Sequence, residues 1–303
     1  TSHMVMPSGP TEMRGGRGRA IVFVGATPSN TTLIDAFNTT TAGDAFDFGD
    51  ASAARYNNGH GGCASATRGV IADGTAMEYV IFSSSGGAND FGDHRVVSGS
   101  GAAIGHAADG VRGLLAGGYN APANLNTIDF ITIATTGKSS EYAEFDDGST
   151  GGYSPMASPT RAVFARGGQN LNFINFTSGG KTQIFGDMRG DSRTGHIASC
   201  SSSTRGIMAG GEAPSRVNTI TFITLATLGN GTDFGDLLAG RNDHDAVSSS
   251  TRGFIVAGAN PSKTNSIEFV TIASTGNGQE FGDLTQARSQ PSSCSDVHGG
   301  LGD

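Results

Sequence analysis

Histidines, cysteines and clustered carboxylates are the side chains of this sequence whose chemistry suits metal binding or proton transfer. Four of the histidines fall shortly before a recurring arginine, and imidazoles gathered at one mouth of a fold would suit a metal ion. Their distances to that arginine are 8, 6, 9 and 8 residues, which is too irregular for one common layer, so we expect no metal there. The four are His60, His106, His196 and His244.

Two segments are rich in carboxylates, and calcium prefers several oxygen ligands. We interpret both segments as solvated charge in turns, and we therefore expect neither a metal nor any other cofactor. The first segment contains Asp44, Asp47 and Asp50, and the second contains Glu141, Glu144, Asp146 and Asp147.

Three cysteines invite a disulfide or a metal site, but their positions follow a repeat. Cys63 and Cys200 each lie five residues before a recurring arginine, and Cys294 fits the same slot. Other copies of the repeat fill this slot with Ala107, Met156 and Val247. A slot that accepts such different apolar residues is a packing position, and an unpaired cysteine behaves as a small buried hydrophobe. We therefore expect three reduced, buried and mutually distant thiols.

The repeat itself is a unit that occurs six times. Each copy has an arginine, a short apolar run, an alternating strand and then Phe-Gly-Asp or a near copy. A period of 44 to 49 residues that is filled with short strands is typical of a propeller blade rather than of a helical solenoid. The arginines are Arg19, Arg68, Arg112, Arg161, Arg205 and Arg252, and the aspartates are Asp50, Asp93, Asp147, Asp187, Asp236 and Asp283.

These arginines and aspartates are the structural anchors of the repeat. One positive and one negative residue in each copy, at fixed offsets, can pair within or between blades, because arginine forms directional bonds to carboxylates. A ring of ligand-binding groups is the alternative interpretation of the same pattern.

The two ends of the chain are out of phase with the repeat. Residues 292–296 match a first strand that no second strand follows, whereas residues 19–25 match a second strand that no first strand precedes. A ring that pairs these two segments has no open edge. We therefore predict an all-β fold, a six-bladed β-propeller over residues 15–303 that the C-terminal strand closes. Residues 1–14 are interpreted as a tag remnant and an N-terminal tail.

The order of these elements resembles the kelch repeat, and Arg241 and Arg288 stand where kelch blades carry an arginine at their exit. The chain departs from that family in lacking the tryptophan of the fourth strand, which a phenylalanine replaces. The amino-acid sequence of the repeat is similar to that of kelch-like arrays in virion and tail-fibre proteins of marine bacteriophages. The segments that carry this likeness are Ser-Ser-Ser-Thr-Arg-Gly at 201–206, Asn-Thr-Ile-Asp-Phe-Ile-Thr-Ile at 126–133 and Asp-Phe-Gly-Asp-Leu at 233–237.

This resemblance implies a non-catalytic structural or adhesion module of a virion, a tail-fibre or capsid-associated propeller, which is assembled in the host cytoplasm among other virion proteins. We see no nucleophile elbow, no phosphate loop and no tryptophan of an Asp box, so we expect no enzyme. A hydrolase or an oxidase remains a third interpretation. No secretory signal is seen, although the tag-like start Thr1-Ser2-His3-Met4 leaves open a processed leader.

The alternative function is a lectin-like propeller that binds a glycan or a receptor on the host surface. Its candidate residues are Tyr119, Tyr142 and Tyr153, in the irregular region of the third and fourth copies, where a lengthened loop breaks the repeat. The net charge of −8 argues against a nucleic-acid partner, in spite of the arginine-glycine segment at 14–19. No apolar run approaches the roughly 20 residues that span a membrane, so we expect no membrane insertion.

Overall fold

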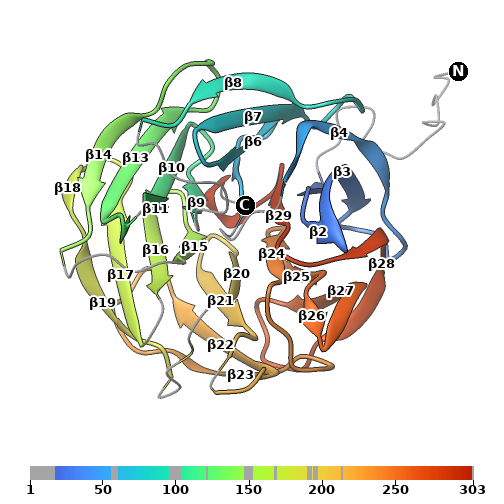
Figure 1. Ribbon diagram of the computed structural model, residues 1–303. Helices are drawn as coiled ribbons and strands as arrows, with labels where there is room; N and C mark the ends of the chain where they lie inside the picture. The colour runs from blue at the N-terminus through green and yellow to red at the C-terminus, as the bar shows by residue number, and fades with distance from the viewer. Residues whose placement is uncertain are drawn as a thin grey trace, which may run out of the picture.

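Six small antiparallel sheets stand in a ring around a central axis (Figure 1). The computed structural model describes residues 18–55, 61–95, 104–120, 122–146, 153–166, 169–189, 193, 197–212 and 214–301. Each sheet has four principal strands that follow one another from the axis to the rim, as in the blade of a propeller. The all-β, six-bladed fold that the repeat predicts is confirmed.

The innermost strand of each blade is short and consists largely of small residues, because six strands must converge near one axis. Nearly all of its residues are buried. In blade order these strands are β29 (Ser292–Ser295), β5 (Cys63–Ala64), β9 (Ile104–Ala108), β15 (Tyr153–Ala157), β20 (Ala198–Ser201) and β24 (Asp245–Ser248).

The second strand begins at the recurring arginine and continues as an apolar run. It is buried on both faces because it lies between two other strands of its blade and between two neighbouring blades, which explains its continuous rather than alternating apolar pattern. These strands are β1 (Arg19–Phe23), β6 (Arg68–Asp73), β10 (Arg112–Gly117), β16 (Arg161–Arg166), β21 (Arg205–Ala209) and β25 (Arg252–Val256).

The third strand is rich in β-branched and aromatic residues, which suit a pleated, half-buried surface. These strands are β3 (Ser29–Asn38), β7 (Ala76–Ile81), β13 (Thr127–Thr132), β17 (Asn170–Asn175), β22 (Thr219–Thr224) and β27 (Ser262–Thr271). The outer strands are β4 (Phe46–Arg55), β8 (Asn89–Asp93), β14 (Ser140–Glu144), β19 (Gln183–Asp187), β23 (Thr232–Asp236) and β28 (Gln279–Arg288).

Short accessory elements complete the described chain. Four of the five accessory strands form or extend hairpins within their own blade, whereas β18 pairs in parallel with β14 of the preceding blade. The accessory strands are β2 (Ala26–Thr27), β11 (Tyr119–Asn120), β12 (Ala123–Asn124), β18 (Gly180–Lys181) and β26 (Ala259–Asn260), and a 3-10 helix, η2, covers Gly299–Leu301.

The ring closes where the two ends of the chain meet. Strand β29 pairs antiparallel with β1, with Cys294 opposite Ile21 and Ser292 opposite Phe23. Blade 1 therefore combines one C-terminal strand with three N-terminal strands, and Figure 1 shows the red strand β29 inside the ring beside the blue blade. The closure that the phase of the repeat predicts is confirmed.

The Phe-Gly-Asp element fastens the outer edge of each blade to its neighbour. Its phenylalanine is buried between blades, as Phe48 shows. The backbone on either side of its glycine accepts bonds from the next blade: Gly86 N–H donates to Phe48 O at 2.8 Å, and Ala88 N–H donates to Asp50 O at 2.8 Å. A Cβ on Gly49 would clash with the carbonyl of Gly86, so the close approach requires a glycine.

Candidate functional site

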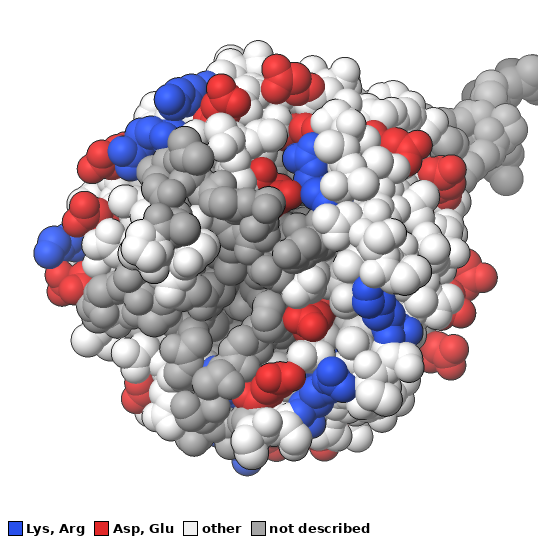
Figure 2. Space-filling view, viewed as in Figure 1, with Lys and Arg blue, Asp and Glu red and all other residues white. Residues whose placement is uncertain are grey.

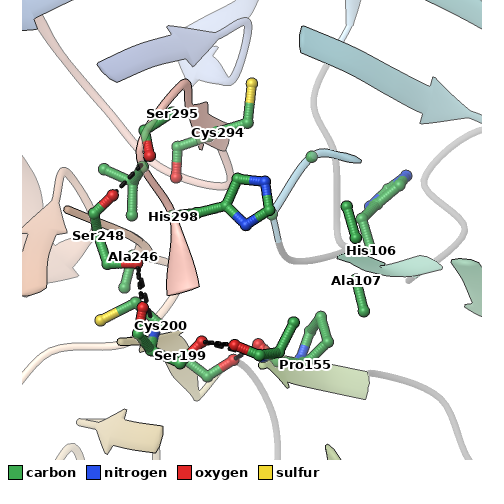
Figure 3. Close-up of a pocket in the computed structure, with 17 residues that line it drawn as sticks. His106, Ala107, Pro155, Ser199, Cys200, Ala246, Ser248, Cys294, Ser295 and His298 are labelled. Carbon is green, nitrogen blue, oxygen red and sulfur yellow. Dashed lines mark hydrogen bonds between the residues drawn. The ribbon is translucent and has the colours of Figure 1, made fainter. Parts of the chain in front are cut away.

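The axis of the propeller holds a cavity of about 50 Å³, which is bounded by the innermost strands (Figure 3). At roughly 10–15 Å³ for each water, it has space for a few water molecules. A pocket for a small organic ligand begins at about 300 Å³. The axial cavity therefore suits ordered water and not a substrate.

Serine hydroxyls on one half of this cavity join neighbouring blades. Ser201 Oγ donates to Ala157 O at 2.7 Å, Ser248 Oγ donates to Ser201 O at 2.7 Å, and Ser295 Oγ donates to Ser248 O at 2.5 Å. The innermost strands diverge too much to share a ladder, so a side chain spans the gap. These hydroxyls are structural bridges, and Figure 3 shows several of them along the cavity wall.

The C-terminal segment occupies the other half of the cavity mouth, where the corresponding positions are alanines. Nε2 of His298 lies 2.8 Å from Ala64 O, and Figure 3 shows the ring pointing into the cavity. Gly300 lies so close to Ala108 O that it has no space for a Cβ. Helix η2 therefore covers the axis, and the C-terminus lies at the centre of the ring in Figure 1.

Two of the four candidate histidines are described, and both bond to the backbone of a neighbouring strand. His106 Nε2 accepts from Ala72 N–H at 3.3 Å, and His244 Nε2 lies 3.0 Å from Ala209 O. His60 and His196 lie outside the described residues. Within the described ranges, no group of three or more His, Cys, Asp or Glu side chains is placed to hold a metal ion.

Asp245 is the buried acid of the axial region. Gly61 N–H donates to both of its carboxylate oxygens at 3.1 Å, and Ser293 Oγ donates to Oδ2 at 2.6 Å. Burial raises the pKa of this carboxyl to about 7, although those hydrogen bonds lower it in part. Asp245 is thus an acid whose pKa lies near neutral pH, and it and its partners join blades 1, 2 and 6.

The three cysteines are free and buried, as their shared slot predicts. Burial raises the pKa of Cys200 to about 12 and raises the pKa values of Cys63 and Cys294 as well, so all three stay protonated and unreactive. Cβ of Cys294 lies 3.2 Å from the point at which Gly62, the residue before Cys63, would carry a Cβ atom. These two thiols therefore lie near one another in adjacent blades, and the expectation of three mutually distant thiols is wrong for this pair.

The recurring arginines bind backbone, not the recurring aspartates. Nη1 of Arg68 donates to Ile133 O of the next blade at 3.0 Å, and Arg161 and Arg205 donate in the same way at 2.9 Å. The same guanidinium stacks on an aromatic ring of its own blade, as Arg205 does on Phe222 with 4.3 Å to the centroid. The remaining acceptors are Phe82 O for Arg19, Phe176 O for Arg112, and Thr39 O and Thr40 O for Arg252.

The recurring aspartates lie on the outer edge of the blades and are exposed where the structure describes them. No ion pair with a recurring arginine is present among these described residues, so the interpretation of an Arg–Asp pair in each blade is wrong. The aspartate contributes its backbone: the N–H of Asp236 donates to Asn277 Oδ1 at 3.0 Å. Asp147 lies outside the described residues, and the others are Asp50, Asp93, Asp187 and Asp283.

A second set of arginines, at the exits of the blades, forms ion pairs with buried acids. Arg288 Nη2 lies 2.7 Å from Asp35 Oδ2, and both side chains are fully buried. Each of these arginines lies at the end of an outer strand or shortly after it, and its acid lies within the third strand of the next blade. The others are Arg55–Glu78, Arg95–Asp129 and Arg241–Glu268, while Arg193 donates to Thr221 Oγ1.

Burial acts strongly on these exit arginines. It lowers the pKa of Arg241 to about 10. It also lowers the pKa of Arg288, and the charge of Asp35 offsets part of that decrease. The sequence already showed one charged residue inside each of several β-branched strands, which is a signal for a buried partner. The likeness to the kelch repeat singles out Arg241 and Arg288, but it does not predict their acidic partners Glu268 and Asp35.

The structure does not bring the three candidate tyrosines together as one exposed surface. Tyr153 is fully buried and stacks on Phe145, with ring centroids 4.2 Å apart, so its placement in a binding surface is wrong. Tyr142 packs against Phe130 and donates its hydroxyl to Asn175 O at 2.9 Å. Tyr119, 43% exposed, is the described member of the three that is open to a partner.

Charge on the face in Figure 2 is mixed. Lysine and arginine are interspersed with aspartate and glutamate on the left of the visible rim, acidic side chains follow one another on the right, and no large continuous patch of one sign stands out. The described part of the chain contains no helix that is long and apolar enough to cross a membrane. No protein-family model matches the chain, and no curated protein matches it.

Proposed function

We propose that this propeller is a non-catalytic structural or adhesion module of a bacteriophage particle, with blades of the kelch type. The observation that carries the proposal is that the recurring polar side chains bond to neighbouring blades. The turn arginines, the exit arginines and the axial serines all join one blade to the next. These residues serve a rigid closed ring and not a reacting centre.

The origin in a phage particle rests on the wording of the repeat, which resembles that of marine phage virion proteins. A closed ring suits such a particle, because the ring has no terminal blade at which unfolding can begin. The partners are then other virion proteins, and assembly takes place in the host cytoplasm.

Immunogold electron microscopy of purified particles tests the location. Antibodies against the purified propeller should decorate a tail fibre or the capsid surface of the phage that encodes it. Particles that carry no label, and whose proteins contain no peptide of this chain by mass spectrometry, would overturn the virion role. Measurable turnover of generic glycoside, ester or phosphodiester substrates by the purified protein would overturn the non-catalytic role.

A second candidate function is adhesion to a host-surface glycan or receptor, and Tyr119 favours it. This ring projects from the short hairpin of β11 and β12 and is 43% exposed, and aromatic rings of this kind are common in binding surfaces. Tyr119→Ala should weaken attachment of the propeller to host cells and leave its melting temperature unchanged. Tyr142→Phe is the matched control, because it removes a hydroxyl that already bonds within the protein.

A further inference from the structure

A cavity of about 290 Å³ opens at the junction between blade 6 and blade 1. It lies between the turn that leads into β25 and the hairpin that joins β3 to β4. Its volume is near the lower end of the range for small-molecule sites, about 300 Å³. Its walls are Gly18, Thr39, Thr40, Ser249, Ser250, Thr251, Arg252 and Val297.

The cavity exists because Thr39 breaks the repeat. In blade 1 the turn arginine Arg19 pairs with Asn38 of the third strand, and Thr39 comes next in the chain. In each of the other five blades the residue at this position is large, apolar and buried. Threonine is smaller than any of these, and its hydroxyl bonds to Gly18 O at 3.0 Å instead of filling the junction. The five apolar residues are Phe82, Ile133, Phe176, Leu225 and Ile272.

Arg252 is held less closely than its counterparts in other blades. Its Nη1 is shared between Thr39 O at 3.4 Å and Thr40 O at 3.3 Å, whereas Arg205 has a single acceptor at 2.9 Å. Among the described residues, no acceptor bonds to Nη2 or Nε of Arg252. Arg252 lines the cavity, and two donors of its guanidinium, in a fork that matches a carboxylate, have no acceptor within the described part of the chain.

The other walls suit the rest of a sugar. Ser250 is half-buried and makes no side-chain hydrogen bond within the described part of the chain, so its hydroxyl can donate and accept. Thr40 and Thr251 also line the cavity, and their hydroxyls can still accept a bond, although Thr40 Oγ1 donates to Asn38 Oδ1 at 2.7 Å and Thr251 Oγ1 lies 3.5 Å from Ser249 Oγ. Val297 offers an apolar contact for the C–H face of a ring. The neighbouring acid, Asp296, is already bonded to the N–H groups of Gly18 and Arg19.

We infer that this cavity binds a sugar residue that carries a carboxylate, such as a uronic acid unit of a surface glycan. Arg252 holds the carboxylate, and the Ser250 and Thr251 hydroxyls hold the ring hydroxyls. The inference rests on the adhesion part of the proposed function and names the chemical class of its ligand.

Titration calorimetry with sodium D-glucuronate, and with D-glucose as the neutral control, tests the site. The full chain should bind glucuronate and not glucose, and high salt should weaken the binding. Thr39→Leu places in blade 1 the side chain that blade 5 has at Leu225, so it should fill the cavity and abolish binding while the protein stays folded. Ser250→Ala should weaken binding about tenfold, a typical effect of losing one hydrogen bond in a small site.

Ser203→Ala is the matched control, because Ser203 holds the same place in the turn of blade 5. It should leave glucuronate affinity unchanged. Absence of glucuronate binding, or binding that Thr39→Leu leaves intact, would overturn the inference. Particle labelling without glucuronate binding would overturn the ligand inference and keep the virion role. Glucuronate binding without particle labelling would keep the ligand inference and overturn the virion role.

Discussion

The sulfur of Met156 lies 2.6 Å from the point at which Gly206 would carry a Cβ atom. Met156 fills the packing slot of blade 4, and Gly206 follows the turn arginine of blade 5. The same contact recurs between Cys294 and Gly69, Cys63 and Gly113, and Cys200 and Gly253. Where the next blade has alanine instead of glycine, the slot holds Ala107 opposite Ala162 or Val247 opposite Ala20.

This pairing predicts a strong coupling between the two positions. Gly206→Ala should destabilise the protein by about 1–3 kcal/mol, because the new methyl group overpacks the blade 4–blade 5 junction. Met156→Ala removes the obstacle and recreates the Ala–Ala pair of blades 3 and 4. The double variant should therefore lose less free energy of unfolding than the two single variants lose together. The difference should be about 0.5–3 kcal/mol, measured by urea unfolding. Strict additivity would contradict the size matching.

The thiols provide a test of the same slot by chemistry. Because Cys63, Cys200 and Cys294 are buried with raised pKa values, a thiol reagent at neutral pH should label none of them quickly in the native protein. In denaturant all three should react at once. Rapid native labelling, counted by the released chromophore, would show that the slot is open to solvent.

The sequence predicts the number of blades and the closure because those features repeat in side-chain identity. It does not predict the partners of the turn arginines. Those partners are backbone carbonyl oxygens in the next blade, and because every residue has such an oxygen, no residue type marks the acceptor. The burial of Tyr153 was within reach: counted from the packing slot, it takes the place of Ile104 and Ile197, which are core residues. The lengthened glycine-rich loop before Tyr153 breaks the repeat and obscures that register in the sequence.

Removing one partner of the buried ion pair between Arg288 and Asp35 should destabilise the protein, because the other charge then stays buried without a counter-ion. Arg288→Met leaves Asp35 buried without its cation, and the expected cost is about 3–5 kcal/mol. Arg189→Met is the matched control, because Arg189 and Asp233 form a pair that is half-exposed. That variant should lose about 0–1 kcal/mol. Equal losses in chemical denaturation would mean that burial of the pair has no energetic role.

Asp245 should make stability depend on pH near neutrality. Its pKa rises from the ordinary value of 3.8 to about 7 on folding, so the native state binds more protons than the unfolded chain between these values. The free energy of unfolding should therefore fall as pH rises from about 4 to 7 and lose no more above that range. Asp245→Asn keeps an acceptor for Gly61 N–H and should be more stable than the parent at pH 8, but not at pH 4. Parallel pH profiles of the two melting temperatures would rule out this role.

Closure by β29 should make the whole ring one cooperative unit. A chain that ends at Gln290 keeps Arg288 but lacks β29, so β1 loses its partner and the slot residue Cys294 disappears from the blade 1–blade 2 junction. We expect the entire β signal in circular dichroism to melt at a clearly lower temperature in a single transition, because each blade is packed only between its neighbours. A chain that ends at Asp296 is the control: it keeps β29 and the bonds from Asp296 to Gly18 and Arg19 and loses only the segment that covers the axis. That control should melt close to the full chain, whereas an unchanged melting temperature for the shorter chain would show that the ring does not depend on its closing strand.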